Sequence, residues 1–169
     1  MATNLTTRRS VVDGSAVMNY AAVAVAVGGL LGLAGVYLNW FRYSYGVTGG
    51  TIHVYLRGSE DWTGQVAFIA AIAAFAFGVA NIVLPDPQIR RLTAGLMGVA
   101  AVLLLGACIA GLFRADAAIG AAPVVLGADP GARVKVATGI SGGLLVSAVG
   151  GIFVVAGAVL SLRPDDVRA

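Results

Sequence analysis

The stretch at residues 137–162, ATGISGGLLVSAVGGIFVVAGAVLSL, contains no charged side chain. A helix of about 20 apolar residues is long enough to cross the hydrocarbon core of a bilayer. Because hydrocarbon offers no hydrogen-bond partner to backbone groups, a single crossing segment must satisfy those groups within a helix. The stretch therefore predicts a transmembrane helix.

Three further uncharged apolar stretches lie upstream, at residues 17–38, 62–84 and 92–113. None of them has the alternation of apolar and polar residues that is typical of a membrane β-barrel. The sequence thus predicts an all-α integral membrane protein, with a four-helix transmembrane domain at residues 17–162. Residues 1–16 and 163–169 are expected to be short segments outside the membrane.

The composition of the 169-residue chain agrees, because 59% of its residues are hydrophobic and only 11% are charged. Soluble domains contain about 25% charged residues, so a soluble enzyme and a disordered chain are excluded. The net charge of +3 forms no basic stripe, which excludes nucleic acid as a partner. The lone cysteine, Cys108, cannot form an internal disulfide or a CxxC metal site.

The basic residues predict the orientation in the membrane. One group lies in short segments close to the helix ends: Arg8, Arg9, Arg90, Arg91, Arg163 and Arg168. The other lies in two longer connections: Arg42, Arg57, Arg114, Arg133 and Lys135. Because the positive-inside rule counts short segments most, we expect both termini in the cytoplasm of a bacterium and a multi-pass protein in its plasma membrane. An aromatic belt is expected at the outer face, from Tyr37, Trp40, Phe41, Tyr43, Tyr45, Tyr55 and Trp62.

The first external connection has the pattern of a small β-hairpin. Tyr43 and Tyr45 alternate with polar residues, Gly49 and Gly50 provide the turn, and residues 51–56 are rich in β-branched and aromatic types. A lone two-stranded hairpin is marginally stable in water, so this one needs a third element.

Two candidates for that third element remain open. One is the second external connection, where Val124, Val125 and Leu126 are apolar. The other is the external domain of a partner. The hairpin residues expected to form an interface are Tyr43, Tyr45, Ile52, Val54 and Tyr55.

Small residues recur at helical spacing in the spans. In membranes, such small-xxx-small stripes let two helix backbones approach closely. They serve either packing within the bundle, which four antiparallel helices require, or docking against a partner's helix. The residues assigned to this helix packing are Gly28, Gly32, Gly139, Gly143, Ser147 and Gly151.

Polar side chains within the spans are few, namely Gln65, Asn81, Thr93, Cys108, Ser141 and Ser147. We expect them to form hydrogen bonds between helices rather than a ligand site. No span contains an ionisable residue of the kind that transporters keep at membrane depth. With a single histidine, His53, and no nucleophile motif, we expect no catalytic residue, no cofactor and no metal.

The layout resembles that of claudin-like four-helix membrane proteins, which have internal termini, an external loop with β-structure and a short inner turn. The loop at residues 39–62 lacks the cysteine pair of claudins, so this resemblance concerns architecture. The chain also resembles small actinobacterial four-helix membrane proteins. Its Tyr37-Leu38-Asn39-Trp40 segment is similar to the end of their first helix, and RGSEDWTG at 57–64 to the close of their external loop.

This second resemblance implies an accessory subunit of a large envelope complex, such as a cell-entry-type lipid importer or a respiratory supercomplex. We therefore expect a non-enzymatic subunit whose partners are other integral membrane subunits and lipids. The alternative is a small homo-oligomeric channel, transporter or lipid-binding membrane protein.

Overall fold

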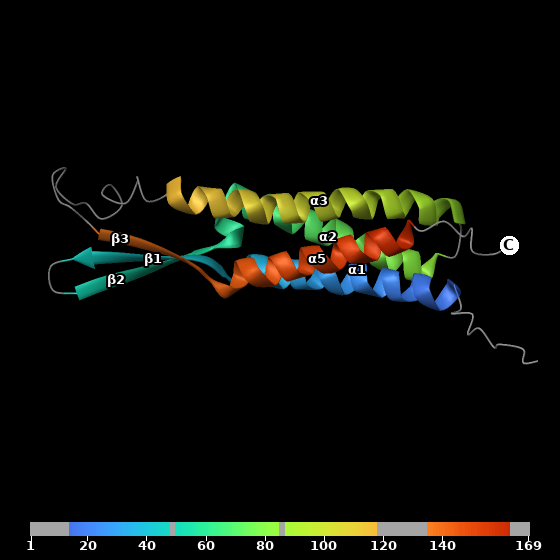
Figure 1. Cartoon of the computed structure of the whole chain (residues 1–169), viewed down its shortest axis with the longest axis horizontal. Helices are drawn as coiled ribbons and strands as arrows, with labels where there is room; N and C mark the ends of the chain where they lie inside the picture. The colour runs from blue at the N-terminus through green and yellow to red at the C-terminus, as the bar shows by residue number, and fades with distance from the viewer. Residues whose placement is uncertain (1–13, 48–49, 85–86, 118–134, 163–169) are drawn as a thin grey trace, which may run out of the picture.

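The apolar stretches form the long helices of the structure, a computed structural model that describes residues 14–47, 50–84, 87–117 and 135–162. Within these residues, four helices are long and apolar enough to cross a membrane, as predicted. They lie side by side, with a small sheet beyond one end (Figure 1). Their bounds are Gly14–Tyr37 for α1, Trp62–Val83 for α2, Pro87–Ala117 for α3 and Gly142–Ser161 for α5.

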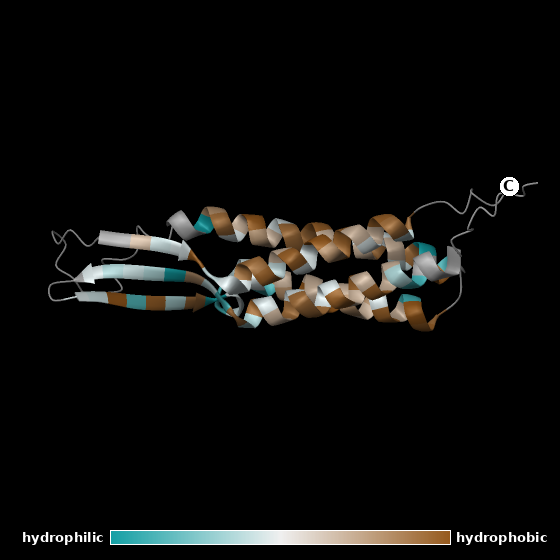
Figure 2. Cartoon of the chain, turned by 60° about the horizontal axis from the view of Figure 1, so that its bottom comes forward, coloured by the Kyte–Doolittle hydropathy of each residue, from teal (hydrophilic) through white to brown (hydrophobic). Residues whose placement is uncertain are grey.

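The four helices form a ring in which each packs against two neighbours. α1 packs against α5 and α2, and α3 packs against α2 and α5. The inner positions are mostly small residues, such as Ala67, Ala71 and Ala74 of α2. Large apolar side chains such as Ile69 and Ile152 point outward instead. Exposed large apolar residues accordingly lie on all four helices, and hydrophobic positions recur along the bundle in Figure 2, as expected of helices surrounded by lipid.

Short polar signals begin and end the helices. Asp61 caps α2, because its carboxylate accepts hydrogen bonds from the Thr63 backbone N–H, at 3.2 Å, and from the Thr63 hydroxyl. Pro87 is the first residue of α3, where a missing N–H has no cost. The connection between α2 and α3 is short, so these two packed helices run antiparallel.

The element beyond the end of the bundle is a three-stranded antiparallel sheet of β1 (Asn39–Val47), β2 (Gly50–Arg57) and β3 (Lys135–Ile140), in the order β2-β1-β3. The predicted hairpin of β1 and β2 is confirmed. A short 3₁₀ helix, η1 (Gly58–Glu60), joins β2 to α2.

The third strand corrects the prediction that residues 137–162 are one helix. Residues 137–140, Gly139 among them, belong to β3 and pair with β1, and helix α5 begins at Gly142. The 20 residues of α5 span about 30 Å, which is enough for the hydrocarbon core. The remaining apolar residues are therefore available for the sheet. Val124, Val125 and Leu126, one of the two candidates for the third element, lie outside the described residues.

Candidate interaction surface

The predicted helix-packing residues of α1 and α5 lie where these two helices meet. A Cβ atom added to Gly28 would lie 2.6 Å from the backbone oxygen of Gly150, and one added to Gly143 would lie 2.8 Å from that of Gly35. The buried Ser147 hydroxyl donates a hydrogen bond of 3.5 Å to the Gly32 carbonyl. These residues therefore hold two backbones in close contact inside the bundle.

Two predicted residues occupy other places. Gly151 faces α3, because an added Cβ would lie 2.6 Å from a methyl carbon of Leu105. Gly139 lies in β3, opposite Arg42 of β1, and so is not part of a helix stripe. The small residues predicted to form one stripe in the last span thus contact different elements: α1, α3 and β1.

The outward-facing Gly95 and Gly98 of α3 were not singled out by the sequence patterns, unlike Gly106, which precedes Ala110 at small-xxx-small spacing. A Cβ added to Gly95, Gly98 or Gly106 would meet nothing within 4 Å. Gly95 and Gly106 are exposed on the same side as Val99 and Val102. This face of α3 is smooth and open, which allows a further helix to approach closely.

The three-stranded sheet has two chemically different faces. Residues paired across an antiparallel sheet project from the same face, so the pairs Tyr43–Val54, Tyr45–Ile52 and Tyr43–Thr138 define one of them. We call this the apolar face; it also carries Phe41, Leu56 and Ile140. The other, polar face carries Arg42, Ser44, His53, Tyr55 and Arg57.

The predicted hairpin interface divides between these faces. Tyr43 and Tyr45 lie on the apolar face and are buried, whereas Ile52 and Val54, on the same face but in the edge strand, are exposed. Tyr55 lies on the polar face and is 51% exposed. Burial raises the pKa of Tyr43 above its ordinary value of 10.0, with smaller contributions from Tyr45 and Asp61.

Trp40 attaches the sheet to the bundle. It is fully buried, and its indole Nε1 donates a hydrogen bond of 3.0 Å to the Gly35 carbonyl of α1. Its ring closely approaches Gly58 and Gly111, and its carbonyl accepts a hydrogen bond of 2.8 Å from the Ser141 N–H. The sheet is therefore mounted on the bundle by contacts with several elements.

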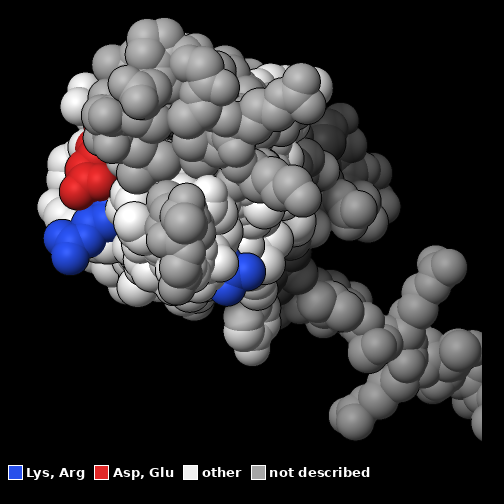
Figure 3. Space-filling view, turned by 90° about the vertical axis from the view of Figure 1, so that its left-hand side faces the viewer, with Lys and Arg blue, Asp and Glu red and all other residues white. Residues whose placement is uncertain are grey.

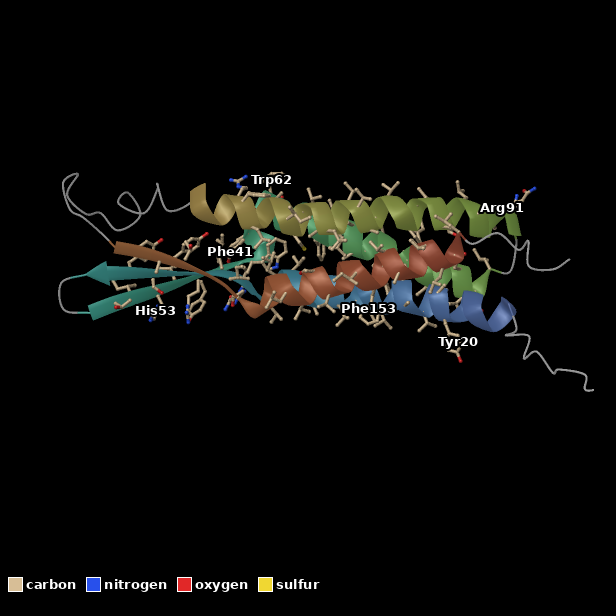
Figure 4. All side chains as sticks on the ribbon, viewed as in Figure 1. Tyr20, Phe41, His53, Trp62, Arg91 and Phe153 are labelled. Atoms are coloured by element: carbon tan, nitrogen blue, oxygen red, sulfur yellow. The ribbon has the colours of Figure 1, made fainter. Side chains whose placement is uncertain are left out.

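This position corrects the expected aromatic belt. Trp40, Phe41, Tyr43 and Tyr45 are core residues, and only Tyr37, Tyr55 and Trp62 are exposed. Figure 4 shows Phe41 where the sheet meets the bundle, with Trp62 nearby. The ring of Trp62 lies 5.6 Å below the Arg114 guanidinium, which is 3.9 Å from the Asp61 carboxylate.

Polar side chains within the bundle mostly bond between helices. The Thr93 hydroxyl of α3 donates a hydrogen bond of 2.8 Å to the Asn81 side-chain oxygen of α2, and the Asn81 amide reaches the sulfur of Met97. Both Asn81 and Thr93 are buried. Gln65 is exposed, and Ser141 precedes α5 at its N-cap. Asn81 and Thr93 therefore join α2 to α3 and need no ligand.

Charged side chains are sparse on the sheet end, as the described part of Figure 3 shows. In the described ranges no three His, Cys, Asp or Glu side chains are close enough to hold a metal ion. His53 bonds to the Ser44 hydroxyl at 2.9 Å in an exposed position.

Comparison of the chain with models of protein families, with curated proteins and with solved structures finds no match. Of the features that the expected resemblance implies, the structure has the four apolar helices and the small hairpin between the first two of them.

Proposed function

We propose that this protein is a non-enzymatic accessory subunit of a larger complex in the bacterial plasma membrane. The observation that supports this best is the external sheet, which is fixed to the bundle through Trp40 and displays exposed Ile52, Val54 and Tyr55. A rigid protrusion with exposed apolar and aromatic side chains is suited to binding another protein.

The outer face of α3 supports the same proposal within the membrane. Gly95 and Gly106 leave open space beside exposed Val99 and Val102. Helix association in lipid depends on close backbone approach at such small residues. A partner's transmembrane helix would dock here, on the same side of the molecule as β3 (Figure 1).

The alternative is a small homo-oligomeric channel, transporter or lipid-binding protein. Coupling and conduction usually depend on ionisable side chains at membrane depth. The four candidate spans contain no Asp, Glu, Lys, Arg or His except Arg91 and Arg114 at the two ends of the α3 span. This absence of membrane-depth charge favours the accessory subunit.

The test is purification of the tagged full chain from native membranes in mild detergent, followed by mass determination and mass spectrometry. We expect a complex with at least one different integral membrane protein in fixed stoichiometry. The double variant Gly95→Leu, Gly106→Leu should lose at least nine tenths of that partner while it remains folded. Ala76→Leu, on the exposed side of α2, is the matched control and should retain it.

A purified species that contains only copies of this chain would overturn the proposal in favour of the homo-oligomer. Equal partner recovery from both leucine variants would show that the α3 face is not the docking surface.

A further inference from the structure

Strand β2 is an edge of the external sheet and, among the described strands, pairs only with β1. All of its residues except Leu56 are exposed. Proteins usually protect such edges with Pro, Lys, a bulge or a very short strand, because unpaired backbone groups attract a further strand. The TIHVYL run at 51–56 has no Pro or Lys. The one irregularity in its pairing with β1 lies at the end of the hairpin next to the bundle, between Asn39 and Phe41 of β1.

From this unprotected edge we propose that β2 binds an extended external segment of a different membrane subunit, which adds to the sheet as a fourth, antiparallel strand. This inference rests on the proposed accessory function and names how the partner is held. The new strand would obtain its affinity from backbone hydrogen bonds and its specificity from side chains at alternate positions.

The topology sets the direction of the added strand. β1 leaves the bundle after α1, whereas β2 and β3 both run back toward it, into η1 and α5 (Figure 1). Antiparallel pairing is slightly more stable per residue than parallel pairing. The partner strand must therefore run away from the membrane, as a segment does directly after an outward-directed transmembrane helix.

The same geometry argues against a second copy of this chain as the occupant. Two copies with the same orientation in one membrane are related by rotation about the membrane normal. Such a rotation preserves strand direction, so the free edge of β2 would meet another copy's β2 or β3 only in parallel. The central β1 has both edges occupied. Among the described strands of a second copy, none can therefore add to β2 in the antiparallel direction.

The two faces of the sheet specify the side chains of the partner. On the apolar face, exposed Ile52 and Val54 would extend over apolar residues of the new strand. On the polar face, Arg42 and Arg57 form no ion pair with any described carboxylate. Arg57 lies on β2 itself, so an acidic residue opposite it on the partner strand would complement its guanidinium group, whereas Arg42 lies one strand further away, on β1.

Photo-crosslinking in native membranes tests the occupant and its direction. Benzoylphenylalanine is placed at Thr51, Ile52, His53, Val54 and Tyr55 in turn, with Tyr20, at the opposite end of the molecule in Figure 4, as the control. We expect cross-links to one segment of another membrane protein, with partner residue numbers that fall as the β2 position rises. The Tyr20 position should give less than a tenth of that yield.

A pair of proline variants tests the ladder itself. Alternate residues of an edge strand direct their N–H outward, so one of His53→Pro and Val54→Pro removes only an outward donor. That variant should keep the melting temperature of the isolated protein and lose at least tenfold in partner recovery. The other should lower the melting temperature, because it removes a bond to β1.

The outcomes separate this inference from the proposed function. Partner residue numbers that rise in step with β2, or cross-links to a second copy of this chain, would overturn the antiparallel heterotypic strand. So would a stable proline variant that retains its partner in full. If a different subunit co-purifies but cross-links only through the helices, this inference fails and the accessory function stands. If no different subunit co-purifies, the proposed function fails as well.

Discussion

The two tryptophans of the chain lie at the same junction but have opposite roles. Trp40 is fully buried against glycines of three elements, whereas Trp62 is 52% exposed. We expect Trp40→Ala to destabilise the fold by about 3 kcal/mol or more, because it leaves a large cavity and removes the bond to Gly35. Thermal unfolding in detergent measures this. Trp62→Ala is the control and should change the melting temperature little; equal losses would show that Trp40 does not anchor the sheet.

Because Tyr43 is buried, we expect the protein to lose stability at alkaline pH. The pKa of Tyr43 is raised above 10.0, mainly because burial disfavours the phenolate. Above the pKa that the Tyr43 hydroxyl has in the unfolded chain, the folded state still binds the phenolic proton that the unfolded state has lost. This contribution to stability is therefore complete below about pH 10 and declines as pH rises through the raised pKa of the folded state.

Thermal unfolding between about pH 9 and pH 12 tests this at the level of one hydroxyl. Tyr43→Phe should remove part of the alkaline decline in melting temperature. Tyr55→Phe, in an exposed position, should leave the decline as in the wild type. A Tyr43→Phe protein with an unaltered pH profile would contradict the assignment.

Single residues were the least predictable level of this structure. An aromatic residue just beyond a membrane span is typical of an interfacial belt, and Trp62 fits that expectation. Trp40 does not, because Gly35, Gly58 and Gly111 lie on separate elements and meet only in the folded chain. No local pattern identifies the pocket they form.

We expect the two sides of helix α5 to differ sharply in their tolerance of a larger side chain. A side chain at Gly143 would collide with backbone oxygens of Asn39 and Gly35, at 2.7 and 2.8 Å, which cannot move without separating α5 from α1. We expect Gly143→Leu to cost about 1–3 kcal/mol or to prevent folding. Ala156→Leu, on the exposed side of the same helix, should be nearly neutral. The check is the yield and melting temperature of folded protein, and similar values for both would contradict close packing at Gly143.

At the level of elements, local patterns predicted the helices and the hairpin well. Uncharged runs of sufficient length define α1, α2, α3 and α5, and alternation with a glycine turn defines β1 and β2. β3 was not predicted, because ATGI at 137–140 continues an apolar run without a break. Its strand conformation depends on pairing with a distant segment, as in Ile140 with Phe41.

At the scale of the whole molecule, the order of the helices around the ring is not encoded in any one of them. Each is apolar on all sides, so hydrophobicity does not mark an inner face; only the small residues do so. For a similar reason, the sequence alone does not predict which edge of the hairpin is free. The free edge of β2 becomes visible only once β3 occupies the other side of β1.

The orientation of the molecule is the remaining whole-chain prediction. The sheet lies at one end of the bundle, and α1 begins and α5 ends at the other (Figure 1). Arg90 and Arg91 lie at that second end, beside the short connection, so the positive-inside rule predicts that it faces the cytoplasm. A fluorescent reporter fused after Ala169 should then be active, and an alkaline phosphatase fusion there should not.

Cysteine labelling of intact cells tests the same orientation from the sheet side. In a Cys108→Ala background, which removes the buried native thiol, Thr51→Cys on β2 should react with a membrane-impermeant maleimide. Gln88→Cys at the start of α3 should react only after the membrane is permeabilised. Because an even number of spans returns the chain to its starting side, one orientation governs all these sites together. Labelling of Gln88→Cys but not Thr51→Cys in intact cells would show that the molecule has the opposite orientation in the membrane. The free edge of β2 would then face the cytoplasm, where its partner strand would have to be sought.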